Sequence, residues 1–546
     1  MNAVVAPSNS QVSKQLRQPP PNPHPPPPSR SGATGSNPYA LVAVLALTLL
    51  AGAVRLAGLA APDGRLSKDE ARLALSADGV LSSGLPVMPS GRVYTRGLLN
   101  GYLIAPSFAL LGRHDFAARL PSALAGALLV PVIFLLGRAL GGAAAGLAAA
   151  AFTALAAPLV DWSRSAWLPS VFLLFFMLAA YGCYRGFVER RGGWQVAGAA
   201  FFCLALLSYE FAVLLPAALG LYIGLLAVRG RRDWYRGRPT LIALGLLVGG
   251  LALFGSLSLA LRAGTLAGPL GEVRAFISPR PDLNGVAFYL RSLLSDYLVL
   301  IAALLMGLPL LARTRPDGTA FLGGLLALAF LVPSLVIQFQ YQVRYALPVL
   351  PLLAVLAAAG TASLAALAGR RLAPTNRWQM ALPGLVLSAV FGAALFHDLG
   401  AIGRLFRQPT PGPTWVQALQ EHGLQPTDLI VTEGPEVVRF YLGRADFNFY
   451  TADNERYTYP AVDAVRSIYT DSALLHERGD FERLVERPNA GRTAWVLGRQ
   501  ERLQRLTQAI DPELWPTLAR SAELMIETRD GWALVKLTLP RRSGPD

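Results

Sequence analysis

The chain has 546 residues, of which 53% are hydrophobic and only 15% are charged. Soluble proteins are typically about a quarter charged, so this composition excludes an ordinary soluble enzyme and indicates a membrane protein. The net charge of +15 could indicate a nucleic-acid-binding protein. The arginines, however, cluster in short loops between apolar segments, as the positive-inside rule predicts for cytoplasmic loops, and we therefore expect no nucleic-acid partner.

Residues 1–38 are rich in Pro, Ser and Asn, and we expect them to form a disordered cytoplasmic tail. The first apolar segment begins near Tyr39, too far along and too long for a signal peptide. About eleven apolar segments follow one another, most of them close to the length of about 20 residues that crosses a bilayer as a helix. They are 39–61, 117–137, 141–160, 166–185, 194–208, 211–228, 239–261, 293–311, 319–337, 345–368 and 378–397. The sequence therefore predicts a polytopic α-helical membrane protein.

The loops between these segments form two alternating sets. The basic set begins near residues 137, 184, 229, 312 and 369, and the other set near 161, 208, 262 and 338. We expect the basic set to be cytoplasmic and the other set extracytoplasmic. The apolar segment 98–111 is short, and a crossing there would place the basic loops opposite the basic N-terminal tail, so we expect it to lie in the membrane interface. Residues 62–116 then form one extracytoplasmic loop.

The composition changes near residue 398 to that of a soluble domain. The stretch "PTWVQALQEHG" is typical of a helix, whereas "DLIVTEG", "RTAWVLG" and "WALVKLTL" are typical of strands. We expect residues 398–546 to form a small extracytoplasmic α/β domain. It carries no nucleophile triad, phosphate loop or metal cluster, so we assign it a structural or acceptor-recognition role.

The cysteine and histidine residues indicate neither a disulfide nor a metal site. Cys183 and Cys203 both lie in apolar segments, as buried thiols do. The five histidines are scattered and none has metal-ligand spacing to another. No cofactor is indicated, and a divalent metal ion is neither required nor excluded.

Charged residues at the membrane edge are costly and are usually functional or paired. On the expected extracytoplasmic side they are Asp69, Glu70, Arg96, Asp115, Arg119, Asp161, Arg164, Glu210 and Arg344. An outward-facing site with carboxylates and several arginines suits an anionic amphiphile, because the planar guanidinium binds phosphate through two hydrogen bonds.

Several of these residues stand in motifs that resemble one superfamily. The motifs are "DEARLALSADGVLSSGLPVMPS" at 69–90, "YTRG" at 94–97 with "ARLPS" further on, and more weakly "DWSRSAW" at 161–167 and "VRYALP" at 343–348. Over residues 40–400 the chain resembles the GT-C membrane glycosyltransferases, the superfamily of the protein O-mannosyltransferases and the lipid A aminoarabinose transferase. The resemblance implies a GT-C catalytic domain at 39–397, a polyprenyl-phosphate-linked sugar donor and a place in the cell (plasma) membrane.

The resemblance also implies a set of site residues. Asp69 and Glu70 would be catalytic, and the donor's phosphate and sugar would be bound by Arg96, Arg164, Arg344, Tyr345 and Tyr102. Two departures weaken the match: Arg96 and Gly97 stand where the family has Lys-Pro, and Trp167 stands where it has a second Arg.

The Asp69-Glu70 pair has two interpretations. Ser67 followed three residues later by Glu70 is a capping box, which on its own favours a helix start over catalysis. The position after the first span and the resemblance favour Asp69 as the general base of an inverting transfer, with Glu70 as a cap that supports it. We also expect Arg119 to pair with a carboxylate of the first loop, while Arg344 could instead be a snorkelling anchor.

These observations predict a glycosyltransferase that moves a sugar from a polyprenyl phosphate to an extracytoplasmic acceptor, which could be a lipid, an envelope glycan or a protein hydroxyl. The leaving phosphate is already anionic and needs cations rather than a general acid. The alternative is a transporter or flippase of lipid-linked glycans. A transporter favours inverted repeats and broken helices in matching halves, and we find no such internal repeat.

Overall fold

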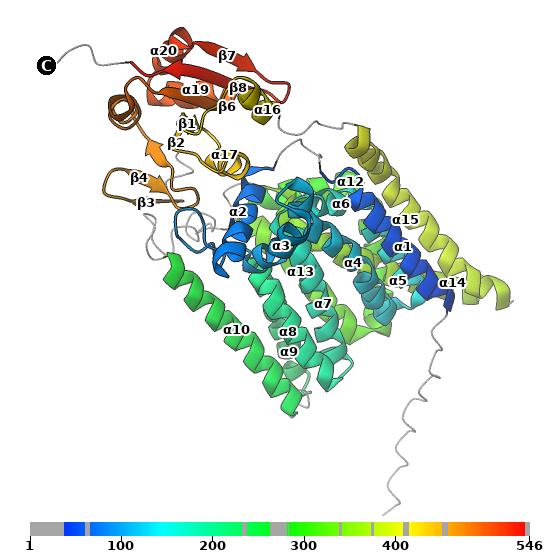
Figure 1. Cartoon of the computed structure of the whole chain (residues 1–546). Coiled ribbons are helices and arrows are strands. Elements are labelled where there is room, and N and C mark those ends of the chain that lie inside the picture. Colours follow the sequence, from blue (N-terminus) through cyan, green and yellow to red (C-terminus); the bar gives the residue numbers. More distant parts are fainter. Residues whose placement is uncertain are drawn as a thin grey trace, which may run out of the picture.

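The computed structural model describes residues 38–60, 66–231, 237–262, 281, 283–337, 341–372, 376–407, 414–449 and 457–540. Residues 1–37 of the predicted tail and 263–280 of the predicted long loop lie outside this range. Within it, nine helices are long and apolar enough to cross a membrane (Figure 1). They are α1 (Pro38–Leu56), α4 (Asp115–Gly141), α7 (Leu168–Cys183) with η1 (Tyr184–Val188), η2 (Glu210–Val213) with α9 (Leu214–Val228), α10 (Arg238–Arg262), α12 (Leu283–Thr314), α13 (Pro316–Val336), α14 (Val349–Leu372) and α15 (Asn376–Arg407).

Each of the eleven predicted segments lies on a helix, so the prediction of a polytopic α-helical fold is confirmed. Two segments differ from a simple long helix. Segment 194–208 is the 17-residue apolar helix α8 (Gly192–Ser208). Segment 141–160 is split into α5 (Ala143–Leu155) and α6 (Ala157–Ser163), which meet at 55°. Among the described residues the spans therefore number nine by length and composition, or ten with this bent pair as one.

The break between α5 and α6 has a local cause. Pro158 is the second residue of α6 and has no N–H to continue the hydrogen bonds of α5. The last carbonyls of α5 are instead satisfied by the buried Arg55 of α1, which donates to Thr153 at 3.1 Å and to Ala154 at 2.8 Å. A charged side chain thus replaces the missing backbone donors at this break.

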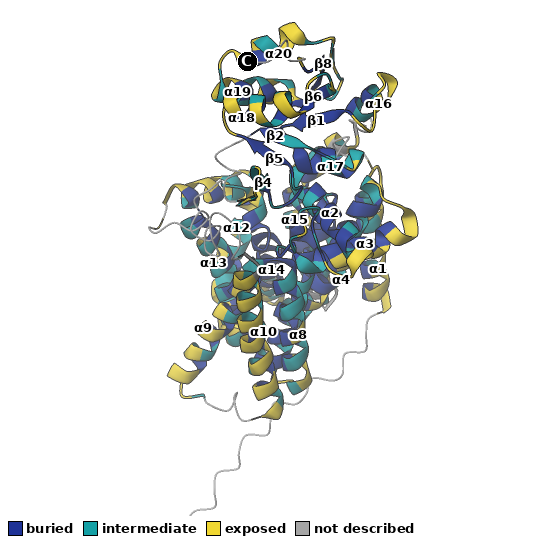
Figure 2. Ribbon diagram, turned by 60° about the vertical axis from the view of Figure 1, so that its left-hand side comes forward, coloured by how far each residue is buried: buried dark blue, intermediate teal, exposed yellow. Residues whose placement is uncertain are grey.

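The helices divide into an inner and an outer set. Most of the apolar window of α4, α7 and α14 is buried, whereas less than a quarter of that window is buried in α1, α10 and α12 (Figure 2). The outer helices keep leucines on their exposed faces, for example Leu45, Leu253 and Leu305. Apolar residues on all sides of a helix are expected where lipid rather than water surrounds it.

The first loop folds into α2 (Lys68–Ser83) and α3 (Leu98–Leu111), with an isolated β-bridge between Val87 and Val93. With 14 residues, α3 is too short to cross a bilayer. The bridge packs on Gly79 of α2, where an added Cβ would lie 2.1 Å from the Val87 carbonyl oxygen. Only glycine allows this contact, and it fixes α2 against the loop that follows it.

The C-terminal residues form an eight-stranded sheet in the order β3-β4-β5-β2-β1-β6-β8-β7. Its strands are β1 (Leu429–Thr432), β2 (Phe447–Phe449), β3 (Thr458–Pro460), β4 (Val465–Ser467), β5 (Ala473–Leu475), β6 (Thr493–Arg499), β7 (Leu524–Glu527) and β8 (Trp532–Thr538). The central strands β5, β2, β1 and β6 are parallel, and the edges are antiparallel. The preceding helix α15 runs to Arg407, past the expected domain boundary at 398.

Residues along the central strands alternate between two cores, as the two-residue period of a strand requires. Ile430 and Trp495 face the cluster that contains α16 (Thr414–Glu421) and α17 (Pro435–Leu442). Val431 and Val496 face the cluster that contains α19 (Gln500–Ile510) and α20 (Leu514–Ser521). The first cluster is continuous with the core of the helical bundle, so the sheet is joined to the bundle through its α17 side (Figures 1 and 2).

Candidate active site

The helix α2 begins at Ser67, which has extended backbone angles. Its hydroxyl accepts a hydrogen bond from the backbone N–H of Glu70 at 3.3 Å, and its own N–H donates to Glu70 Oε2 at 2.8 Å. This is a complete capping box. The predicted cap is therefore confirmed, and it fixes the turn that carries both carboxylates.

Glu70 is buried and fully engaged. It is 2% exposed, and Arg119 of α4 donates to Oε1 from Nε at 2.8 Å and to Oε2 from Nη2 at 3.3 Å. The backbone N–H of Ala166 also donates to Oε1 at 2.8 Å. Burial alone would raise the pKa of Glu70, but the Arg119 charge and these hydrogen bonds outweigh it and hold the pKa below its ordinary value. The expected pairing of Arg119 with a first-loop carboxylate is confirmed, and Glu70 has no open face for a substrate.

Asp69 points in a different direction from the same helical turn and is partly open, with 32% of its side chain exposed. Each carboxylate oxygen faces a different arginine. Arg72 Nη1 is 3.2 Å from Oδ1, and Arg344 Nη1 is 3.3 Å from Oδ2. Asp69 is thus a solvent-reachable carboxylate held between two guanidinium groups.

Arg344 belongs to the short helix η4 (Val343–Ala346), just before α14. Its guanidinium carbon lies 5.2 Å from the ring of Tyr345, 5.8 Å from that of Trp162 and 6.0 Å from that of Trp167. Burial would lower the pKa of Arg344, but Tyr345 and Asp69 outweigh it and raise the pKa above its ordinary value. Its buried Nε has no hydrogen-bond partner among the described residues. The Arg344 guanidinium is therefore surrounded by three aromatic rings, and its Nε–H donates to none of the described residues.

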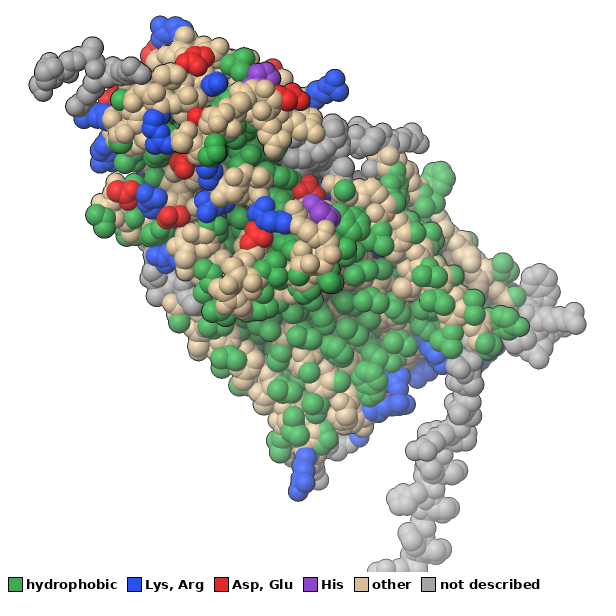
Figure 3. Space-filling model, in the orientation of Figure 1, with side chains coloured by type: hydrophobic (Ala, Val, Ile, Leu, Met, Phe, Trp, Pro, Cys, Tyr) green, Lys and Arg blue, Asp and Glu red, His purple; other side chains and the backbone are tan. Residues whose placement is uncertain are grey.

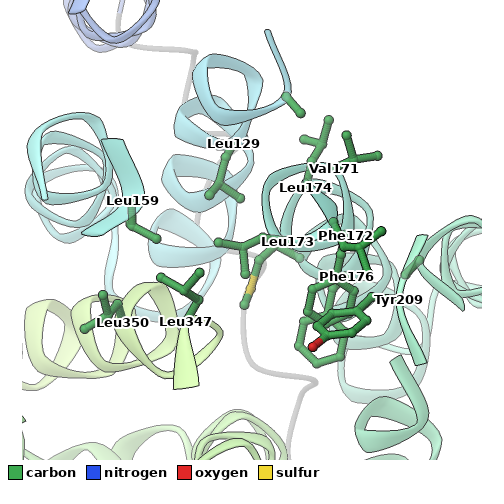
Figure 4. Close-up of a cluster of buried hydrophobic side chains, with 14 of the residues drawn as sticks. Leu129, Leu159, Val171, Phe172, Leu173, Leu174, Phe176, Tyr209, Leu347 and Leu350 are labelled. Carbon is green, nitrogen blue, oxygen red and sulfur yellow. The ribbon is translucent and has the colours of Figure 1, made fainter. Parts of the chain in front are cut away.

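Arg96 lies beside the ring of Trp167, which also lies near Arg344. Its guanidinium carbon is 5.9 Å from the ring of Trp167 and 5.9 Å from that of Tyr209. Tyr209 in turn packs edge-on against Phe172 at 5.5 Å, on an apolar cluster that also includes Leu347, which lies between η4 and α14 (Figure 4). The residues brought together are therefore Asp69, Arg96, Arg344 and Tyr345.

The other two predicted binding residues lie elsewhere. Arg164 is buried, and its terminal nitrogens donate to the carbonyls of Val54, Arg55 and Gly58 at 3.1, 3.3 and 3.2 Å. It thus caps the C-terminal end of α1, where a cation is favourable. Tyr102 donates to the Gly84 carbonyl at 3.0 Å, at the end of α2 opposite Asp69.

Three contributors to the site were missed at the level of sequence. Arg72 follows Asp69 by three residues, a spacing at which helical side chains meet, so it could have been inferred. Trp167 stands where the family has an arginine, but its ring contacts the guanidinium groups of both Arg96 and Arg344. Glu436 contacts Arg72 from 364 residues away, and no local pattern could have predicted that pairing.

In the part of the chain that the structure describes, no three His, Cys, Asp or Glu side chains gather in a way that could hold a metal ion. Both carboxylates of the first turn of α2 face guanidinium groups instead. The described site is therefore an arrangement of arginines, aromatic rings and one open carboxylate.

A family model described as dolichyl-phosphate-mannose-protein mannosyltransferase matches residues 95–257. The match begins at the residue before Arg96 and ends in α10. No curated protein matches the chain by sequence.

Two solved proteins share the fold over most of the chain. ArnT from Cupriavidus metallidurans in the apo state has 18% identity and a TM-score of 0.61, and the match covers 93% of this chain and 99% of that one. Its form bound to undecaprenyl phosphate has 18% identity and a TM-score of 0.60, and the match covers 94% of this chain and 100% of that one. The archaeal oligosaccharyltransferase AglB from Archaeoglobus fulgidus was solved in complex with an inhibitory peptide and a dolichol-phosphate. It has 12% identity and a TM-score of 0.55, and the match covers 92% of this chain and 74% of that one. The chain therefore shares its fold with these two proteins over most of its length.

Proposed function

We propose that this protein is a membrane glycosyltransferase that moves a sugar from a polyprenyl phosphate to a hydroxyl acceptor on the extracytoplasmic face of the cell membrane. The observation that carries the proposal is the partly open Asp69 carboxylate beside the aromatic-lined Arg344, at the start of the first-loop helix. Two findings support the choice of donor. The family model that matches is named for a dolichyl-phosphate sugar, and ArnT was solved with undecaprenyl phosphate.

Asp69 is the proposed general base. It takes the proton of the acceptor hydroxyl while the acceptor oxygen forms a bond to the sugar's C1 from the face opposite the phosphate. The bond from C1 to the phosphate oxygen breaks, and its electron pair leaves with the polyprenyl phosphate. Such a displacement inverts the configuration at C1.

Arg344 and Arg96 are the proposed phosphate ligands, with Tyr345 beside them. A leaving group that is already anionic is stabilised by fixed cations in a site with little water. Arg344 contacts Asp69, so an arriving phosphate would compete with Asp69 for this guanidinium. Donor binding would thereby free Oδ2 of Asp69, so that the base could accept the acceptor's proton once the donor is bound.

The remaining predicted residues have other places in the proposal. Glu70 and Arg119 form the buried support of the turn that presents Asp69. Arg164 holds the end of α1, and Tyr102 holds the far end of α2, so neither is proposed to contact the donor. A direct assay of lipids, envelope glycans and protein hydroxyls would identify the acceptor.

The experiment uses membranes containing the wild-type chain, Asp69→Asn or Asp78→Asn, each supplied with radiolabelled polyprenyl-phosphate sugars. Asp78 lies on the same helix but pairs with Arg113, so its variant is a matched control. We expect Asp69→Asn to lower transfer by about 10²- to 10⁴-fold, the contribution typical of a general base, and Asp78→Asn to leave it unchanged. Equal transfer by wild type and Asp69→Asn would overturn the base assignment. Movement of the intact donor across the bilayer, with no transfer from any donor, would favour the transporter alternative.

A further inference from the structure

The sheet domain meets the start of α2 through a cluster of charges around two buried carboxylates, those of Glu433 and Glu436. Lys68 donates to the Glu433 carbonyl oxygen at 2.9 Å and lies 3.8 Å from its carboxylate. Arg502 of α19 lies 3.0 Å from the same carboxylate. Glu436 of α17 lies 2.7 Å from Arg72. The helical turn that carries Asp69 is thus held from the sheet side by acidic residues of one short segment.

Arg72 is the residue that joins this cluster to the site. Its Nε and Nη2 donate to Glu436 Oε1 at 3.0 and 2.7 Å, and its Nη1 donates to Asp69 Oδ1 at 3.2 Å. Its guanidinium carbon lies 4.4 Å from the ring of Tyr469 and 5.3 Å from that of Tyr457. Two of its three nitrogens and one face of the guanidinium are therefore committed to residues of the sheet domain.

Glu436 is charged in this setting. It is 4% exposed, and burial would raise its pKa, but the charges of Arg72 and Lys68 outweigh burial and keep the pKa below its ordinary value. A buried ion pair of this kind is costly to leave half-formed. Arg72 is consequently anchored toward α17, and only its Nη1 is left to contact Asp69.

We propose that Glu436 is a positioning residue for the transfer reaction, which acts by holding Arg72 so that a single guanidinium nitrogen contacts Asp69. The inference rests on the proposed role of Asp69 as the base. It makes the sheet domain part of the catalytic machinery rather than a cover, because one end of the Asp69–Arg72–Glu436 chain lies in that domain.

The geometry sets what loss of Glu436 would do. Without the charge of that carboxylate, the Nε and Nη2 donors of Arg72 keep at most a weaker, neutral acceptor, and Asp69 is then the charged acid that Arg72 contacts. A fork of two N–H groups on Asp69 would occupy the oxygens that the acceptor hydroxyl needs. The effect falls on the chemical step, whereas the donor phosphate is still met by Arg344 and Arg96.

The test compares three variants of the full chain in purified form: Glu436→Gln, Glu436→Asp and Tyr441→Phe. Tyr441 lies on the same helix α17 and forms another contact between the sheet domain and the bundle, with its hydroxyl 2.8 Å from both oxygens of Asp115. Its variant therefore weakens the interface without touching Arg72. For each variant, kcat, the KM for a polyprenyl-phosphate sugar and the thermal unfolding midpoint are measured.

We expect Glu436→Gln to lower kcat by about tenfold or more, as small displacements of reacting groups do, with the donor KM within about twofold of wild type. Glu436→Asp keeps the charge but is shorter, so its kcat should lie between those of wild type and Glu436→Gln. Tyr441→Phe should keep the wild-type kcat. If Glu436→Gln does not fold, Glu436→Asp against Tyr441→Phe gives the same comparison.

Equal losses of kcat in Glu436→Gln and Tyr441→Phe would show that only the interface matters and would overturn the inference. So would a raised donor KM with an unchanged kcat. These outcomes differ from failure of the proposed function, which would appear as full transfer by Asp69→Asn.

Discussion

Asp69 and Glu70 are neighbours with opposite surroundings. Successive residues of an α-helix point about 100° apart, so the first turn of α2 can bury one carboxylate and leave the other open. Glu70 meets Arg119 in the core, whereas Asp69 meets Arg72 and Arg344 at the open side. The pair is therefore divided into a buried, paired acid and a partly exposed one, which is the proposed base.

This division predicts different effects on stability. Glu70→Gln keeps the size and the capping position but leaves the buried Arg119 without its counter-charge. Removing one partner of a buried ion pair costs about 3–5 kcal/mol of the free energy of unfolding. Asp69→Asn should cost about 1 kcal/mol or less, because Asp69 is partly exposed and its pairs are screened by solvent. Unfolding of both variants in the same detergent measures the difference, and equal losses would contradict it.

The same pair sets a pH dependence of stability. The pKa of Glu70 is lowered in the folded protein, so its contribution is fully present above the ordinary value of 4.5 and is lost as the pH falls through the lower folded value. We therefore expect the wild type to lose stability below about pH 4.5 relative to Glu70→Gln. A constant difference between the two proteins from pH 7 to pH 3 would contradict this.

At the scale of residues, pairings within one helical turn could be predicted from the sequence, but which charged side chains are buried, and against what, could not. The capping box of Ser67 and Glu70 follows from spacing within one turn, and it is present. For Arg164 the sequence indicates which side of the membrane it is near, but not whether its guanidinium faces a site or the carbonyls at the end of α1. That choice depends on how three helices pack, which no local pattern records.

At the scale of elements, α2 is fixed by its contacts on both ends and along its middle. Ser67 caps its start, and Gly84 ends it in a left-handed conformation with φ of 76°. Gly79 lies directly on the backbone of the Val87 bridge. Because Asp69 is presented by this helix, its placement depends on contacts more than two turns away.

Gly79→Ala should therefore destabilise the protein although alanine is the better helix former. The added Cβ would meet backbone atoms of Val87 that cannot rotate away, and forced repacking of this kind costs about 1–3 kcal/mol. Gly220→Ala on α9 is the control, because a Cβ there has no neighbour within 4 Å. We expect it to be neutral or to stabilise by up to about 1 kcal/mol. Thermal unfolding of both variants in the same detergent measures the difference. An unfolding midpoint for Gly79→Ala equal to that of Gly220→Ala would contradict the expected clash.

The elements themselves were largely predictable. Long apolar segments have few alternatives to a helix in a bilayer, and the short apolar stretches near residues 429 and 494, typical of strands, fall on β1 and β6. The bend at Pro158 was missed, although proline at the start of a helix is a recognised signal. An apolar run by itself hides such a break, because both halves remain apolar.

At the scale of the whole molecule, charge is distributed unevenly along the axis of the helices. On the face shown in Figure 3, acidic and basic side chains lie together on the sheet domain and first loop, a mostly hydrophobic belt covers the helices, and basic side chains mark the opposite end. The sheet domain is tied to the first loop by Arg72–Glu436 and Tyr441–Asp115. These contacts require the sheet and the first loop to share one side of the membrane.

This arrangement makes a prediction about topology. In a background with Cys183 and Cys203 replaced by serine, single cysteines are placed at the exposed positions Ser82 in α2, Glu513 before α20 and Thr314 at the end of α12. A membrane-impermeant maleimide added to intact cells should label Ser82→Cys and Glu513→Cys, and should label Thr314→Cys only after the membrane is opened. Thr314 is uncharged, so its replacement leaves the basic loops that set orientation unchanged. Labelling of Glu513→Cys together with Thr314→Cys rather than with Ser82→Cys would place the sheet on the cytoplasmic side, and it would separate Glu436 from the base that it is proposed to position.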